Sequence, residues 1–214
     1  MAQRELPILR AAGTLLQSLE KPLCFDAAQA LARLLAGNDR FRENTRNPAP
    51  LTGEIRLKTA VGGQHPFAAV VCCADSRVPA EHIFSAGIGD LFIIRNAGNV
   101  MSPSALASVE YAVAHLHVPL VLVLGHRGCG AVAAALEDHA APGALGALVA
   151  QVRANIGAAQ TAAEAELANV KSALAALQES EILRSAKGSG KAAFVGAIYD
   201  SATGAVSFSD GADA

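Results

Sequence analysis

The sequence predicts an α/β fold with a mainly parallel β-sheet, an antiparallel edge strand, flanking helices and an N-terminal helical arm. Short, continuous apolar runs of strand length recur through the middle and near the end of the chain. They lack the polar alternation of a strand with one face in water, so they are typical of a parallel sheet buried on both faces. Helical segments lie between the runs, and this alternation indicates crossover connections.

The predicted arm comprises residues 1–47. From residue 7 to residue 47, apolar side chains recur at three- and four-residue spacing, which is typical of helices. Pro22 divides the segment into two helices, and Asp26 stands where it can cap the second. A proline-containing stretch at 47–50 predicts a loop. An arm made only of helices needs a surface to lie on.

The apolar runs and the segments between them define the order of the elements. A clear helical pattern at 104–115 precedes the third run, and a long alanine-rich helical region at 144–186 precedes the fourth. Residues 203–208 have the pattern of a turn followed by the antiparallel edge strand. The four predicted parallel strands are 67–73, 91–95, 120–124 and 194–199.

Length and charge exclude several classes of protein. With 214 residues, we expect a single domain, 1–214. The 17 basic and 19 acidic side chains give a formal net charge of −2 without a basic cluster, which argues against nucleic acid as a partner. The apolar runs are far shorter than the ~20 residues of a membrane-spanning helix. The N-terminus lacks the pattern of a secretory signal, so we expect a cytoplasmic protein.

Two predicted strands end in residues that can bind a metal. Cys73 closes the first strand, and His126 and Cys129 follow the third, where an alanine-rich helix at 131–138 begins. Ligands bind beyond the carboxyl ends of strands in open α/β sheets, so these side chains should meet at one edge. Two thiolates, one imidazole and an open position form a known catalytic zinc site. The alternative is a coincidence of core cysteines and a turn histidine, and Cys72, on the other strand face, is expected to be a core residue.

A second motif, Gly-Ser-Gly-Lys at 188–191, has some likeness to a phosphate-binding loop. Ser185 stands where that loop requires its first glycine, Ala192 replaces the serine or threonine, and the motif precedes a strand instead of following one. We therefore interpret it as a turn.

Four segments resemble the signature motifs of the β-class carbonic anhydrases, in the order of that family. They are Cys-Ala-Asp-Ser-Arg-Val-Pro-Ala-Glu at 73–81, Arg-Asn-Ala-Gly-Asn at 95–99, Ser-Val-Glu-Tyr at 108–111 and Gly-His-Arg-Gly-Cys-Gly at 125–130. The resemblance implies reversible conversion of CO2 to bicarbonate and a proton by zinc-bound hydroxide. It also implies a homodimer or a tetramer, with the arm wrapped around a partner subunit.

The resemblance further implies roles for individual residues. Asp75 and Arg77 would form a dyad beside the metal, in which Arg77 keeps the carboxylate of Asp75 from becoming the fourth metal ligand. Gln64 would donate a hydrogen bond to the substrate, commonly across a dimer interface. The ligands of Zn2+ would be Cys73, His126 and Cys129.

Two other functions remain open for the same residues. One is hydrolysis of carbonyl sulfide or carbon disulfide on the same zinc site. The other is a non-enzymatic zinc-stabilised or thiol-sensing protein, in which all four metal positions are filled. The presence of both Asp75 and Arg77 favours an open, working site over a filled one.

Overall fold

The computed structural model describes residues 25–45, 47, 51–137 and 141–208, and it has a five-stranded sheet in the order β2-β1-β3-β4-β5. The first four strands pair in parallel, and β5 pairs with β4 in the antiparallel direction. The predicted fold class is therefore confirmed, and the predicted strands are found with small shifts at their ends. The strands are β1 Ala68–Cys73, β2 Leu91–Asn96, β3 Leu120–His126, β4 Ala193–Tyr199 and β5 Val206–Phe208.

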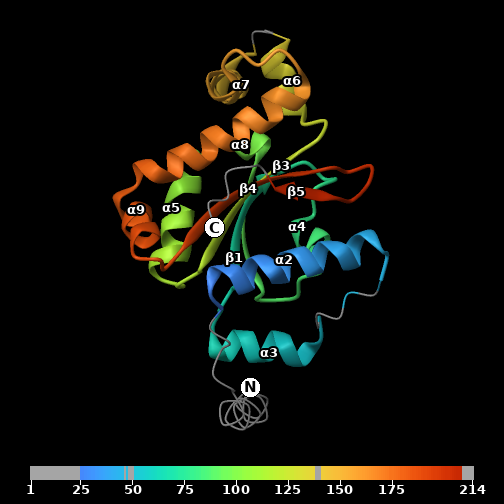
Figure 1. Cartoon of the computed structure of the whole chain (residues 1–214), viewed down its shortest axis with the longest axis vertical. Coiled ribbons are helices and arrows are strands. Elements are labelled where there is room, and N and C mark those ends of the chain that lie inside the picture. Colours follow the sequence, from blue (N-terminus) through green and yellow to red (C-terminus); the bar gives the residue numbers. More distant parts are fainter. Residues whose placement is uncertain (1–24, 46, 48–50, 138–140, 209–214) are drawn as a thin grey trace, which may run out of the picture.

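Helices cover both faces of the sheet, which explains why the strands read as continuous apolar runs (Figure 1). Alternate residues of β1 and β3 enter two different cores. Val71 and Val123 pack in the core beneath α5, α8 and α9, whereas Val70 and Leu122 pack in the core beneath α2 and α4. The bounds are α5 Pro103–Ala114, α8 Ala162–Glu179, α9 Glu181–Gly188, α2 Ala27–Arg42 and α4 Ala80–Ile83.

Helix α2 is the part of the predicted arm that the structure describes. Asp26 caps it as predicted and forms a capping box with Gln29. Ala30 and Leu34 are fully buried in the core on the chain's own sheet. The first helix of the arm and Pro22 lie outside the described residues, so packing of residues 1–47 on a partner stays a prediction.

The alanine-rich region is divided into three helices, where the sequence pattern predicts one long helical region. The first, α7 Gly143–Ile156, is followed by Gly157, whose φ of 55° is left-handed. A capping box between Thr161 and Glu164 then starts α8, and Ser180 caps α9. Local capping residues therefore break a continuous alanine pattern.

Helix α3, Gly53–Gly62, is an element that the sequence pattern does not predict. Thr52 caps its N-terminus, but none of its residues is buried. A helix with little apolar spacing and no buried face leaves only a weak signal in the sequence. Among the described helices, none combines the length and the hydropathy needed to cross a membrane.

A third core lies beyond the carboxyl ends of β1 and β3, between the short helix η1 Ala97–Asn99 and the helices α6 Gly130–Leu136, α7 and α8. Gly125 allows α8 to approach the end of β3 closely, because a Cβ at this position would lie 2.6 Å from Cγ2 of Val170. The fold thus packs three helices around the edge of the sheet where the predicted metal ligands stand.

Candidate metal centre

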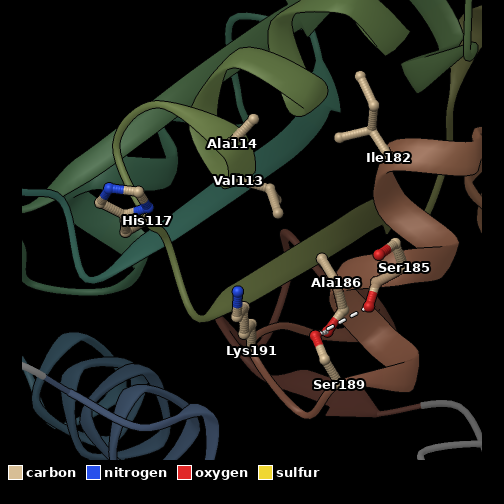
Figure 2. Close-up of a pocket in the computed structure, with 8 residues that line it drawn as sticks. All are labelled: Val113, Ala114, His117, Ile182, Ser185, Ala186, Ser189 and Lys191. Carbon is tan, nitrogen blue, oxygen red and sulfur yellow. Dashed lines mark hydrogen bonds between the residues drawn. The ribbon is translucent and has the colours of Figure 1, made fainter.

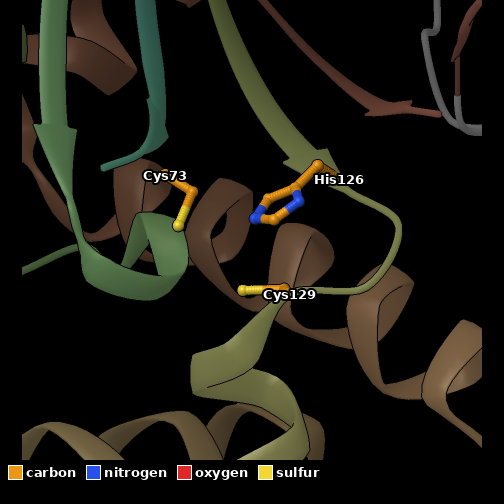
Figure 3. A group of neighbouring side chains, drawn as sticks. All are labelled: Cys73, His126 and Cys129. Carbon is orange, nitrogen blue, oxygen red and sulfur yellow. The ribbon is translucent and has the colours of Figure 1, made fainter. Parts of the chain in front are cut away.

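Three side chains from three separate elements point toward one another at this edge (Figure 3). Cys73 is the last residue of β1, His126 is the last residue of β3, and Cys129 is the N-cap of α6. Their ligand atoms all lie within 4.8 Å of one another, and all three residues are buried. Ligands of one tetrahedral zinc ion lie roughly 3.5–3.8 Å apart, so the cluster has the dimensions of a metal site.

The imidazole of His126 is held in the orientation that a metal ligand requires. Its Nδ1 lies 3.1 Å from the carbonyl oxygen of Arg127, which assigns the ring proton to Nδ1 as a donor. Nε2 is buried and has no hydrogen-bond partner among the described residues. A buried polar atom without a partner is costly, and a cation between the two thiols would use its lone pair.

Contacts between the two thiols shift their pKa values in opposite directions. The hydrogen bond from Cys129, together with contacts from His126 and from the backbone N–H groups of Asp75 and Gly98, lowers the pKa of Cys73 to about 4, although burial opposes it. The same contact with Cys73, and then burial, raises the pKa of Cys129. A divalent cation bound here would be held by both cysteines as thiolates, because metal ligands must be deprotonated.

Cys72 is separate from this cluster, in agreement with its predicted role. Its side chain is fully buried in the core beneath α2 and α4. Burial raises the pKa of its thiol to about 12. Adjacent cysteines on opposite faces of one strand thus have different environments.

Asp75 and Arg77 form a charged pair beside the cluster. The backbone N–H and Nε of Arg77 donate to Oδ1 of Asp75 at 2.9 and 3.0 Å, and Nη2 donates to Oδ2 at 2.7 Å. These hydrogen bonds hold the pKa of the Asp75 carboxyl well below its usual range. Oδ2 lies 4.0 Å from Nε2 of His126, so the carboxylate is adjacent to the cluster but engaged by Arg77.

Known proteins that are similar to this chain have a family in common, and the match to that family includes this site. A family model described as carbonic anhydrase matches residues 68–206, which include the whole cluster and the Asp75–Arg77 pair. The chain belongs to the β-class of carbonic anhydrases. The resemblance of the four sequence motifs is therefore confirmed.

Two curated relatives of this family are carbonic anhydrases of mycobacteria. Carbonic anhydrase 2 of Mycobacterium tuberculosis is 47% identical over 113 residues, which cover 51% of this chain and 54% of that protein. The match thus spans about half the length of that relative. The carbonic anhydrase of Mycolicibacterium smegmatis is 38% identical over 167 residues, which cover 73% of this chain and 81% of that protein.

Solved β-carbonic anhydrases have the same fold. A tetrameric enzyme from Sordaria macrospora superimposes with a TM-score of 0.68 at 27% identity, over 74% of this chain and 87% of that chain. The enzyme CafA of Aspergillus fumigatus superimposes with a TM-score of 0.64 at 34% identity, over 75% of this chain and 83% of that one.

Gln64 is the one candidate site residue of this β-carbonic anhydrase chain that stands apart from the others. It is exposed and precedes β1, whereas Cys73 ends the same strand. The six residues of β1 alone span roughly 17 Å at the rise of a β-strand. Within one chain, therefore, Gln64 lies at the opposite end of the sheet from the cluster.

Three further residues support the centre, and the sequence alone assigned no role to any of them. Arg95 donates from Nε to the carbonyl of Cys73 at 3.2 Å and from Nη2 to the carbonyl of Asp75 at 2.8 Å. Two side chains of α8 also reach the centre. Glu166 binds the backbone of Gly128, which is 38 residues away in the sequence, and Asn169 binds the backbone of Gly98, which is 71 residues away. Contacts over such separations leave no spacing pattern in the sequence.

A separate cavity of about 470 Å³ lies between α5 and α9, near the start of β4 (Figure 2). His117 and Lys191 are among the residues that line it, and residues 189–191 form a turn directly after α9, as the sequence predicts. The backbone N–H groups of residues 189–192 all donate to carbonyls of α9. They are therefore not free to hold a phosphate, which agrees with the reading of this motif as a turn.

Proposed function

We propose that this protein is a zinc enzyme that catalyses the reversible hydration of CO2 to bicarbonate and a proton. The observation that carries the proposal is the buried cluster of Cys73, His126 and Cys129 with the paired Asp75 carboxylate next to it. Three protein ligands leave one tetrahedral position for water or substrate, as catalytic zinc sites do. Family relatives named carbonic anhydrase support the same activity.

The donor set fits Zn2+ on chemical grounds. Two thiolates and a neutral imidazole are preferred zinc ligands, and the unpartnered Nε2 of His126 faces the place that the ion would take. Bound here, zinc would act as a Lewis acid that makes a coordinated water acidic enough to serve as the nucleophile.

In this proposal, the chain's own residues orient the reaction. Asp75 accepts a hydrogen bond from the attacking water and so directs a lone pair toward the carbon of CO2. Arg77 keeps the carboxylate ionised and in place through the hydrogen bonds that both oxygens accept. Because the carboxylate is occupied by Arg77, the fourth metal position stays available to water.

Gln64 serves the active site of a partner subunit in this proposal. The distance along β1 keeps it from its own cluster, so a role in substrate binding requires a second copy of the chain. We therefore infer a homodimer or a tetramer, in keeping with the tetrameric enzyme of Sordaria macrospora.

Zinc determination combined with a stopped-flow assay of CO2 hydration tests the proposal. We expect about one zinc per chain, and we expect Cys73→Ser to lose metal and activity together. Cys72→Ser is the matched control, because it changes the neighbouring thiol on the other face of the strand and should keep both. An active Cys73→Ser enzyme with bound zinc would contradict the ligand assignment.

The same assay separates the two other functions. Turnover of carbonyl sulfide or carbon disulfide without CO2 hydration would identify the alternative hydrolase. Bound zinc without turnover of any of these substrates would identify the non-enzymatic protein.

A further inference from the structure

We propose that Glu166 and Asn169 of α8 are positioning residues that hold the backbone around both thiolate ligands of the metal. The inference rests on the proposed function, because it concerns the same centre. It adds a role for a helix that contributes no ligand itself. Neither residue is exposed, at 4% for Glu166 and 1% for Asn169.

Glu166 holds the turn that joins His126 to Cys129. Its Oε1 accepts a hydrogen bond from the backbone N–H of Gly128 at 2.7 Å, and its Oε2 accepts one from Nη1 of Arg127 at 2.8 Å. Gly128 has a left-handed φ of 69°, and its N–H faces α8 in this conformation. A buried carboxylate is costly unless it is paired, so both contacts are needed to offset the burial of Glu166.

The other backbone polar groups of Arg127 and Gly128 also have hydrogen-bond partners. The N–H of Arg127 donates to the carbonyl of Tyr199 at 2.8 Å, and the carbonyl of Gly128 accepts from Arg77 at 3.0 Å. The carbonyl of Arg127 faces Nδ1 of His126. Every backbone polar group of the two residues between the ligands thus has a partner, and among the described residues Glu166 is the acceptor for the N–H of Gly128.

Asn169 holds the other thiolate through Gly98. Its Nδ2 donates to the carbonyl of Gly98 at 2.7 Å, and the N–H of Gly98 donates to Sγ of Cys73 at 3.3 Å. Oδ1 of Asn169 accepts from Asn155 at 2.8 Å, and Oδ1 of Asn155 accepts from Ser172 at 3.0 Å. A polar chain between α7 and α8 therefore fixes the amide of Asn169.

The two residues lie three positions apart, so they stand on the same face of α8. That face is brought to the site by the close packing of Val170 against Gly125. One helix face thus supports the turn before Cys129 and the donor to Cys73. Outer partners of this kind orient metal ligands, and their loss typically costs about 10- to 100-fold in metal affinity.

The test uses the full chain with Zn2+ and Co2+ as probes. Glu166→Leu keeps the size of the side chain but leaves the N–H of Gly128 unpaired, so we expect zinc affinity to fall by about 10- to 100-fold. Glu166→Gln keeps an acceptor for that N–H and should recover most of the affinity. Asn169→Ala tests the second arm of the inference and should weaken zinc binding in the same range.

Glu164→Leu is the matched control on the same helix. Glu164 only caps the N-terminus of α8, through the backbone N–H groups of Gln160 and Thr161. Its loss should lower the thermal unfolding midpoint without changing zinc affinity. If Glu164→Leu weakened zinc binding as much as Glu166→Leu does, the effect would be one of helix stability, and the inference would be wrong.

Chelator competition measures the zinc affinity, and the thiolate-to-cobalt absorption of the Co2+ protein reports the ligand geometry at full metal occupancy. We expect this band to change in Glu166→Leu and Asn169→Ala and to match the parent in Glu164→Leu. Parent-like affinity and absorption in folded Glu166→Leu and Asn169→Ala would overturn the inference alone. A parent chain that binds no zinc would overturn both the inference and the proposed function.

Discussion

Arg77 donates hydrogen bonds to both carboxylate oxygens of Asp75, at 3.0 Å from Nε and 2.7 Å from Nη2. The same Nη2 also donates to the carbonyl of Gly128 at 3.0 Å. Arg77 therefore joins the carboxylate beside the candidate metal centre to the turn that carries His126 and Cys129. A substitution of Arg77 should therefore affect both the Asp75 carboxylate and this turn.

Asp75→Asn removes the charge of the carboxylate but keeps its shape. The amide is a poorer acceptor for the attacking water, so kcat/KM for CO2 hydration should fall by about 100-fold or more while zinc stays bound. Asp39→Asn is the control, since Asp39 is 65% exposed in a surface pair with Arg42. An undiminished Asp75→Asn enzyme would show that this carboxylate does not orient the nucleophile.

Arg77→Gln releases the carboxylate of Asp75 from its partner. We expect Asp75 to take the fourth metal position, which would abolish hydration and change the visible spectrum of the Co2+ protein. The double variant Asp75→Asn, Arg77→Gln lacks this carboxylate and should return to a spectrum with an open position. Identical spectra for the parent and Arg77→Gln would contradict this role of Arg77.

The pH profile of CO2 hydration should rise from neutral to moderately alkaline pH. Two thiolates would neutralise the charge of a bound zinc ion, so a coordinated water would lose its proton at a higher pH than on a site with three imidazoles. Stopped-flow measurement of kcat/KM against pH checks this expectation. A flat profile for the parent would be inconsistent with an ionising nucleophile at this centre.

The ionisation of Asp75 itself should not appear in the pH profile of CO2 hydration. Hydrogen bonds from Arg77 lower the pKa of the Asp75 carboxyl. An acid with a lowered pKa stays charged in the folded protein until the pH falls below that lowered value. Since the usual value for Asp is about 3.9, the carboxylate stays charged throughout the neutral and alkaline range. Asp75→Asn should therefore lower the profile without removing a limb from it.

Subunit mixing tests whether Gln64 acts across an interface. Gln64→Ala and Cys73→Ser should each be inactive, but a mixed dimer joins an intact metal cluster to an intact Gln64 of the other subunit. Random exchange at equal amounts should restore about a quarter of the parental sites. Exchange shown by mass spectrometry without recovered activity would place Gln64 outside the partner's site.

Much of the fold and the meeting of Cys73, His126 and Cys129 could be predicted from the sequence, because their signals are local. The parallel strands are continuous apolar runs, and the two ligand-bearing segments begin where β1 and β3 end. Parallel strands place their carboxyl ends at one edge, so this register implies that Cys73 meets His126 and Cys129. Cys72 could be separated from Cys73 by the two-residue period alone.

Only the tertiary structure decided which residues support that cluster and which stand away from it. Glu166 and Asn169 contact backbone groups 38 and 71 residues distant, and a backbone N–H or carbonyl looks the same at every position of a sequence. The unpredicted helix α3 buries no residue, so it has no strong apolar pattern to detect. Gln64 lies at the far end of β1 from Cys73, because a six-residue strand separates them in the folded chain. Sequence spacing fixes which side chains share a strand end, whereas contacts between distant segments depend on how the helices pack on the finished sheet.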